Sequence, residues 1–256
     1  VCDLRGSARE VRVFFHHDIS IGGFPVGDTV NYDPKTMGLV HYKDGCYFLV
    51  NGCDSRKCGI DHFATGTKRL GEAEGTWRDA EDGQLVRSAI SQGSVDSTIG
   101  FDLKLQPGGE EHLVYWIAAA DSYKAARQLN QKVLDRTAER MIRRTEAYWR
   151  LWACKEPLDF SPLPEPLRDH YVRSELILRT QVDHDGAIIA ANDTDITHFA
   201  GDTYSYMWPR DGAICCQSLV LAGHSELSRR FFRFCQRVVE PEGYFLHKYN
   251  PTGTLA

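Results

Sequence analysis

The chain has 256 residues, of which 42% are hydrophobic and 25% are charged, an ordinary balance for a globular protein. Its formal net charge of −5 argues against a partner such as nucleic acid or an anionic membrane surface. No apolar run approaches the ~20 residues that a membrane-spanning helix needs. This length allows one large domain or two ordinary ones.

The first half of the chain predicts short antiparallel strands. Apolar residues alternate with others over residues 11–15 and again over 99–105, which is the period of a strand. Asp44 and Gly45 separate two short apolar runs and predict a type I′ hairpin. The continuous apolar run over 113–119 predicts a strand covered on both faces. Short strands with turn signals between them favour a β-sandwich.

Two groups of metal-binding residue types occur in this half. His16 and His17 are adjacent in a strand and point to opposite faces, so they are interpreted as structural. Cys53 and Cys58 have no second pair or histidine at zinc-finger spacing, so no zinc site is expected. The irregular spacing of the eight cysteines favours reduced thiols. Together with the lack of a basic-then-apolar leader at the start, this predicts a cytoplasmic location.

From Ser122 the hydrophobic period changes to that of a helix. Apolar residues recur every three or four positions as far as Trp152, and charged residues fill much of the remaining surface. Because no Gly or Pro interrupts residues 123–155, the pattern predicts one helix of roughly 45 Å, at 1.5 Å per residue. A proline-rich linker follows it, with Pro157, Pro162, Pro164 and Pro166.

Three further helices are predicted after this linker. The first covers residues 165–182 and is apolar enough to be expected in a buried position. The second covers 211–222, with Gly223 as its C-cap. Ser225 is the expected N-cap of the third, which runs to about Val239. Helix hairpins repeated in this way are typical of the opening of an α/α barrel.

Residues 204–213 carry the densest chemistry, in the order Tyr-Ser-Tyr-Met-Trp-Pro-Arg-Asp-Gly-Ala. Flat rings cover the apolar faces of a sugar, while Arg and Asp bind neighbouring hydroxyls through charge-assisted hydrogen bonds. Pro209 fixes its own φ and introduces the helix that follows. The stretch therefore predicts a pocket for a neutral polyol. In the alternative interpretation, the rings are core and Asp211 only caps the helix.

This stretch resembles the Trp-Pro-Arg-Asp signature of the glucoamylase-like glycoside hydrolases, family 15, and is most similar to the bacterial and archaeal glucoamylases. Further stretches resemble the same family in the same order, at residues 12–18, 41–43, 187–191 and 243–251. The resemblance implies a β-sandwich domain followed by the start of an (α/α)6 barrel, a partial two-domain protein.

On this resemblance, residues 1–121 are the C-terminal part of the β-sandwich domain. Residues 122–164 are a linker that contains the long helix, and residues 165–256 are the N-terminal part of the catalytic barrel. The chain begins with Val1 rather than Met and stops at Ala256 just after a turn. We therefore expect an internal fragment of a larger enzyme.

The resemblance also implies roles for individual residues. Tyr204 would line the pocket beside the terminal sugar, and Trp208 would pack near the sugar and the catalytic acid. Arg210 and Asp211 would hydrogen-bond hydroxyls of the non-reducing glucose, which rejects sugars of the wrong stereochemistry. Lys248 would reach the rim of the pocket; its alternative is an exposed lysine in a turn.

The family hydrolyses α-glucosides with two glutamates, an acid and a base, and inverts the anomeric centre. Neither glutamate motif is present here, so no catalytic residue is named, and no metal or cofactor is expected. The parent protein is predicted to release glucose from the non-reducing ends of α-glucans, its substrate partner, whereas this chain alone is predicted to be inactive. Asp193, Asp195 and Asp202 are interpreted as turn residues.

Three alternatives remain open. The same signature suits an α,α-trehalase or another exo-acting α-glucosidase, since it recognises the shared terminal glucose. A noncatalytic carbohydrate-binding β-sandwich would need exposed coplanar rings, and Trp77 and Trp116 are the only tryptophans in that half. A metal hydrolase lacks an HExxH-like helix pair; its ligands would come from His184, Asp185, Asp193, Asp195 and His198.

Overall fold

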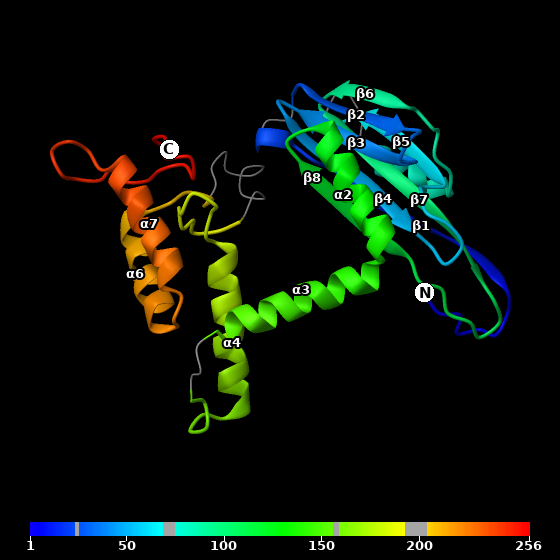
Figure 1. Cartoon of the computed structure of the whole chain (residues 1–256). Coiled ribbons are helices and arrows are strands. Elements are labelled where there is room, and N and C mark those ends of the chain that lie inside the picture. The colour runs from blue at the N-terminus through cyan, green and yellow to red at the C-terminus, as the bar shows by residue number, and fades with distance from the viewer. Residues whose placement is uncertain (24–25, 69–74, 156–158, 193–203) are drawn as a thin grey trace. The chain divides into compact units, whose positions relative to one another are not determined.

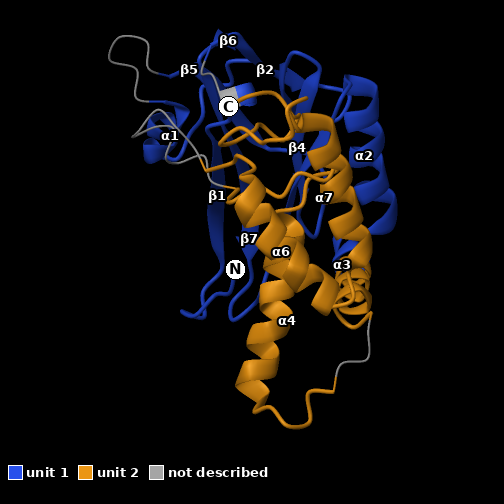
Figure 2. Ribbon diagram, turned by 90° about the vertical axis from the view of Figure 1, so that its left-hand side faces the viewer, with its two compact units in different colours: residues 1–142 blue, residues 143–256 orange. Residues whose placement is uncertain are grey.

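The computed structural model describes residues 1–23, 26–68, 75–155, 159–192 and 204–256 (Figure 1). The chain divides into two compact units, Val1–Ile142 and Arg143–Ala256 (Figure 2). This division falls inside a helix, α3 (Ala138–Ala153). The domain limits expected from the sequence stay a prediction.

Unit 1 contains two antiparallel sheets. The three-stranded sheet has the order β1 (Arg9–His17), β7 (Val95–Leu105), β5 (His62–Thr67). The five-stranded sheet has the order β6 (Ile90–Gly93), β2 (Asp28–Asp33), β3 (Gly38–Lys43), β4 (Cys46–Cys53), β8 (Val114–Ala120). Short helical turns connect these strands, namely η1 (Ile21–Gly23), α1 (Thr76–Asp79) and η2 (Ala80–Asp82).

The five-stranded sheet is covered on both faces, because successive strand residues point to opposite sides. Leu39 shares a buried cluster with Ile99 and Phe101 of the other sheet. Its neighbour Val40 instead shares a cluster with Ala126 of α2 (Tyr123–Arg136). Figure 1 shows this helix lying along β4 and β8. The core of unit 1 therefore has two layers, one between the sheets and one under α2.

The predicted hairpin is confirmed. Strands β3 and β4 pair from Lys43 opposite Cys46, and the two residues between them have positive φ, 47° at Asp44 and 80° at Gly45. Two consecutive residues of positive φ make the type I′ turn whose twist matches that of the strands.

The prediction that residues 113–119 form a strand covered on both faces is wrong. Strand β8 lies at the edge of the five-stranded sheet and pairs with β4 alone. Within β8 only Ala118 is buried, whereas Ile117 is 46% exposed. Strand β8 is apolar throughout because its two faces lie toward the two layers of the core, one between the sheets and one under α2. At the edge of the sheet, however, these side chains are only partly covered.

Of the two adjacent histidines, His17 is buried in the polar part of this core and His16 is exposed. His16 bonds Thr98 through Nδ1, whereas His17 bonds Ser97 through Nδ1 and the Tyr115 hydroxyl through Nε2. His41 reaches Ser97 as well, 2.8 Å from Nε2 to Oγ. Burial lowers the pKa of His17 to about 4 and that of His41 to about 3, so both rings are neutral at pH 7.

The single long helix predicted from Ser122 onward is wrong. Helix α2 ends at Arg136, and α3 begins at Ala138 after Thr137, whose φ is 59°. The Thr137 carbonyl accepts from Met141 N at 3.2 Å, so Thr137 stands at the N-cap position of α3. Threonine is favoured there, and Glu139 in the first turn suits the helix dipole. Thr137 and Glu139 therefore mark the start of a new helix, although the apolar stripe continues across the break.

The expectation of reduced thiols is wrong for one pair, because a disulfide joins Cys53 and Cys58. Six other cysteines are free: Cys2, Cys46, Cys154, Cys215, Cys216 and Cys235. Because disulfides are rare in reducing compartments, this bond weakens the prediction of a cytoplasmic location that was based on cysteine spacing. Among the described helices, none combines the length and the apolar character needed to cross a bilayer.

Unit 2 contains the predicted helices as α4 (Glu165–Thr180), α6 (Pro209–Leu221) and α7 (Ser225–Val238). Gly223, with φ of 85°, follows α6 as expected. The N-cap of α7 is His224 and not Ser225, which is the first helical residue. The expected burial of the helix over 165–182 is also wrong: within α4, Glu175 is the only buried residue and Leu167 is 55% exposed.

Candidate functional site

The Trp-Pro-Arg-Asp stretch is fixed by its buried neighbour Met207. This residue exchanges two backbone hydrogen bonds with Tyr249, both of 2.9 Å. On its other side, Tyr206 O accepts from Ala190 N at 3.0 Å. Alternate residues of extended backbone face opposite sides, so burying Met207 turns Tyr206 and Trp208 away from the core. The stretch is thereby held as a short strand between two other segments.

At Trp208 the chain passes from this strand into helix α6. Trp208 is extended, with φ of −104° and ψ of 124°, and Pro209 occupies the first helical turn. Proline is tolerated there because its position needs no backbone donor. Gly212 N then donates to Trp208 O at 2.9 Å and closes the turn. Arg210 and Asp211 consequently project from the first turn of α6.

Close packing against α7 fixes the start of α6 in unit 2. A Cβ on Gly212 would meet the Phe231 ring at 2.3 Å, so only glycine allows this approach. The cysteines nearby are packing groups: Cys216 is buried, and Cys215 and Cys235 are half-buried. Burial, followed by the charge of Asp211, raises the pKa of Cys215, and burial raises that of Cys235 to about 11.

The second wall of the site comes from the loop after α7. The Tyr249 hydroxyl accepts from Leu246 N at 2.7 Å and donates to Val238 O at 3.0 Å. Since Tyr249 is also paired with Met207, one buried residue ties this loop to both the end of α7 and the Trp-Pro-Arg-Asp stretch. The loop is thereby held opposite the beginning of α6.

A cavity of about 220 Å³ lies between these walls. Its lining comprises Trp208, Pro209, Arg210, Asp211, Phe245, Leu246 and His247. Arg210 Nη2 lies 3.6 Å from Asp211 Oδ2, and the two side chains are 82% and 49% exposed. Such an exposed pair is weak and easily separated. Both charged groups are therefore available to a ligand in the cavity.

Aromatic rings flank this cavity. The Trp208 ring centroid lies 6.0 Å from that of Tyr204 and 5.9 Å from that of Tyr206. Lys248 Nζ lies 4.0 Å from the centroid of the Tyr206 ring, a cation–π contact. Exposed rings beside charged hydrogen-bonding groups suit a ligand that has apolar faces and polar edges, as a sugar does.

Known proteins similar to this chain carry glycosidase names. In sequence, the chain is 25% identical over 250 residues to an uncharacterized glycosyl hydrolase of Methanocaldococcus jannaschii, covering 94% of this chain and 38% of that protein. In structure, it is similar to a bacterial glucoamylase complexed with acarbose. The TM-score is 0.73 and the identity 15%, with 96% of this chain and 36% of that chain covered. No model of a protein family matches.

The resemblance to glucoamylase-like glycoside hydrolases is confirmed. At 15% identity, the structural likeness establishes a glucoamylase-like fold. This chain spans 38% of its glycosyl hydrolase relative and 36% of the glucoamylase. What those longer proteins do thus supports a proposal for this chain, which is made below.

Only three of the five predicted site residues line the cavity. Trp208, Arg210 and Asp211 line the cavity. Tyr204 is 56% exposed and contacts the site through the Trp208 ring, whereas Lys248 lies over Tyr206. Their contacts with a sugar stay a prediction.

Four lining residues were not among the predicted site residues: Pro209, inside the recognised signature, and Phe245, Leu246 and His247 from the loop after α7. The resemblance already included the stretch over 243–251, and that was the signal available. Within this stretch, Lys248 was chosen because its charge suggested a function. The fold instead brings the three residues before it to the cavity.

The sequence offered other acidic and histidine candidates. Asp193, Asp195, His198 and Asp202 lie outside the described residues. Asp185 belongs to a turn in which its backbone N donates to Asp183 Oδ1 at 2.7 Å. Within the described ranges, no group of three or more His, Cys, Asp or Glu side chains could hold a metal.

Proposed function

We propose that this chain is part of a glycoside hydrolase that releases glucose from the non-reducing ends of α-glucans by inverting acid/base hydrolysis. Its share of the work is recognition of the terminal glucose. The observation that carries the proposal is the cavity in which Trp208 meets the exposed Arg210 and Asp211. The glycosyl hydrolase relative and the glucoamylase fold support the same class of reaction.

In this proposal, each group has a chemical role. The terminal sugar ring lies against the Trp208 indole, where C–H groups meet an aromatic face. The Arg210 guanidinium donates to a sugar hydroxyl, and the Asp211 carboxylate accepts from another. A hydroxyl of opposite configuration would leave a charged group without its partner, which gives selectivity for glucose. Tyr204 and Lys248 extend the binding surface.

The acid and base are proposed to come from outside this chain, as two glutamates. The 256-residue chain by itself is therefore expected to leave maltose and starch intact. Turnover by the purified chain would contradict this and would direct attention to Asp193, Asp195 and Asp202.

The fold is interpreted in the same way. The two sheets of unit 1 would be the C-terminal part of a β-sandwich, residues 1–121, and residues 122–164 the linker. Helices α4, α6 and α7 would open an (α/α)6 barrel over residues 165–256. The exposed apolar side chain of Leu167 supports this, because further barrel helices would cover it.

Substitution of the charged pair in the complete protein tests the role of this cavity. Asp211→Asn and Arg210→Gln are each expected to lower kcat/KM on maltooligosaccharides about 100-fold, since each removes a charge-assisted hydrogen bond. Glu226→Gln is the matched control, because Glu226 belongs to an exposed ion pair with Lys155 in the same unit. Unchanged kinetics in both site variants would contradict the proposal.

The substrate is tested on the complete wild-type protein by comparing maltooligosaccharides with trehalose. Preference for the former supports the glucoamylase-like activity, and preference for trehalose identifies an α,α-trehalase built on the same glucose site. If the protein binds glucans through unit 1 and hydrolyses neither, it is a binding module. In unit 1, Trp116 is committed to structure, since its Nε1 donates to Asn130 Oδ1 at 2.9 Å.

A further inference from the structure

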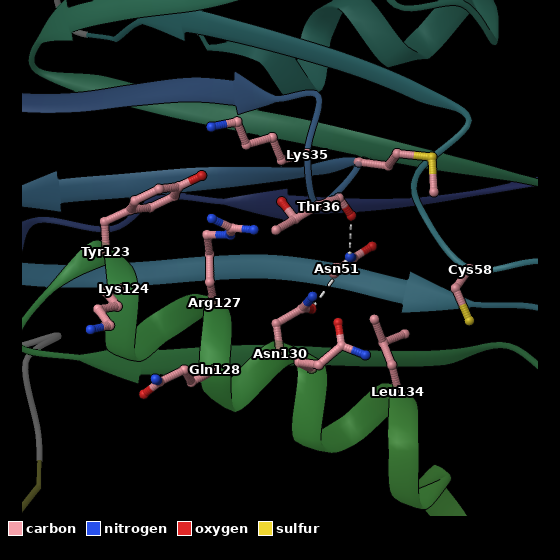
Figure 3. Close-up of a pocket in the computed structure, with 12 residues that line it drawn as sticks. Lys35, Thr36, Asn51, Cys58, Tyr123, Lys124, Arg127, Gln128, Asn130 and Leu134 are labelled. Carbon is pink, nitrogen blue, oxygen red and sulfur yellow. Dashed lines mark hydrogen bonds between the residues drawn. The ribbon is translucent and has the colours of Figure 1, made fainter.

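Unit 1 contains a second cavity, of about 420 Å³, which the proposed glycosidase chemistry does not use (Figure 3). Its walls are the turn between β2 and β3, strand β4, Cys58 and one side of α2. The residues used below are Lys35, Asn51, Tyr123, Lys124, Arg127 and Asn130, all in the lining. The cavity is therefore formed within a single compact unit.

The lining is positively charged although the chain as a whole has a net charge of −5. It includes Lys35, Lys124 and Arg127 and no acidic residue. In the described part of the chain none of the three forms a direct ion pair; Arg127 lies over the Tyr123 ring, at 5.6 Å, and its charge helps to lower the pKa of Asp33. Figure 3 shows Lys35 and Arg127 on the Tyr123 side of the cavity. Three cationic side chains thus lie at this cavity without a direct ion pair.

The nearest carboxylate, Asp33, is already committed. It accepts from Thr36 Oγ1 and from the Tyr123 hydroxyl, each at 2.8 Å, and from Lys35 N at 3.1 Å. Burial raises its pKa, but these hydrogen bonds outweigh burial and hold the pKa below its usual value, so Asp33 is ionised. One internal negative charge against three positive ones leaves an excess that an anion would balance.

A buried donor completes the site. Asn130 is only 2% exposed, and its Oδ1 accepts from Trp116 Nε1 at 2.9 Å and from Asn51 Nδ2 at 3.4 Å. Because an indole N–H can only donate, it fixes which end of the amide is oxygen. The Asn130 amide nitrogen is the other end, and it has no hydrogen-bond partner among the described residues. Because Asn130 lines the cavity, this donor is open to an acceptor on a bound ligand.

We propose that this cavity binds a small phosphorylated ligand of the sugar phosphate class. The phosphate lies among Lys35, Lys124 and Arg127, and an oxygen of the sugar accepts from Asn130. Cationic side chains are the usual partners of phosphate oxygens. The cavity is larger than a lone phosphate requires, and its lining offers amides for hydroxyl groups, which favours a sugar ester over the bare ion. This inference concerns unit 1 and does not depend on the glycosidase proposal.

The test is an NMR titration of the ¹⁵N-labelled 256-residue chain with glucose 6-phosphate, inorganic phosphate and glucose. We expect glucose 6-phosphate to shift the Asn130 side-chain amide resonance in a saturable way, phosphate to bind more weakly, and glucose not to bind. Binding of the ester should weaken as salt is added, because exposed charges are screened. Arg127→Gln and Lys124→Gln should each weaken binding about tenfold.

Lys132→Gln is the matched control, because Lys132 is an exposed residue of the same helix outside the cavity lining. It should bind glucose 6-phosphate as the wild type does, and each variant is checked for an unchanged unfolding temperature. Both cavity substitutions are at exposed positions, so one carries the test if the other fails to fold. The proposal is overturned if neither anion binds at ~10 mM, if glucose binds as well as its phosphate, or if Lys132→Gln weakens binding equally.

Discussion

At the scale of single residues, unit 2 depends on positions where size or bonding allows only one side chain. Gly212 has no room for a Cβ against Phe231, and Tyr249 uses its hydroxyl both as donor and as acceptor. Neither residue carries the proposed chemistry. Both decide whether Trp208 and Asp211 face the loop that completes the cavity.

Gly212→Ala tests this packing. The added methyl group must displace the Phe231 ring, so the substitution should destabilise unit 2 by about 1–3 kcal/mol in urea unfolding. Gln217→Ala on the exposed side of α6 is the control and should change little. Adding Phe231→Leu should recover part of the loss from Gly212→Ala. If Gly212→Ala is as stable as the control, the close approach of α6 and α7 is wrong.

Elements formed by local signals were predictable, whereas elements decided by distant partners were not. Asp44 and Gly45 fix a hairpin within four residues, so the sequence pattern sufficed. The exposure of α4 and the edge position of β8 depend on which other segments cover them, and hydrophobicity alone carries no such information. In the site, the Trp-Pro-Arg-Asp stretch was recognisable as a motif. Phe245 also lines the cavity, but its loop is held there by contacts between distant residues, such as the bond from Leu246 N to the Tyr249 hydroxyl.

The buried histidines of the sheets predict acid sensitivity. His17 and His41 have folded pKa values of about 4 and about 3, below the ordinary value, so the unfolded chain takes up protons first as the pH falls. Their contribution to stability is complete above pH ~6.5 and is lost on acidification, at ~1.4 kcal/mol per pH unit for each histidine. The loss ends near pH 4 for His17 and near pH 3 for His41. Urea unfolding at a series of pH values measures this slope.

The matched variants separate the two histidines from the exposed ones. His41→Gln keeps a polar group near Ser97 but does not titrate, so the pH slope of stability should fall by about one proton. His112→Gln should leave the slope unchanged, since the side chain of His112 is 80% exposed. An unaltered slope in His41→Gln would show that the His41 ring is not held neutral by burial.

At the scale of the whole molecule, the cores are separate. One buried cluster in unit 2 includes Phe231 and Tyr249, and the two clusters of unit 1 lie between its sheets and under α2. Cooperative unfolding requires shared contacts, so units with their own cores can unfold independently. The larger cavity belongs to one unit and the proposed glucose site to the other.

Differential scanning calorimetry should therefore resolve two transitions. Gly212→Ala is expected to lower only the transition of unit 2, and His41→Gln only that of unit 1. A ligand of the larger cavity should raise the unit 1 transition alone, because it binds that folded unit. A single transition that both substitutions shift would mean that the two units unfold as one.

The backbone pairing of Met207 with Tyr249 has a consequence for how new specificities could arise. It joins the two walls of the proposed glucose site, which are distant in sequence. Side chains on the Phe245 face can therefore be exchanged while the Arg210 and Asp211 face keeps its position. Among enzymes built this way, sequence variation should therefore concentrate in the loop that contains Phe245. The residues proposed to bind the sugar hydroxyls should stay the same.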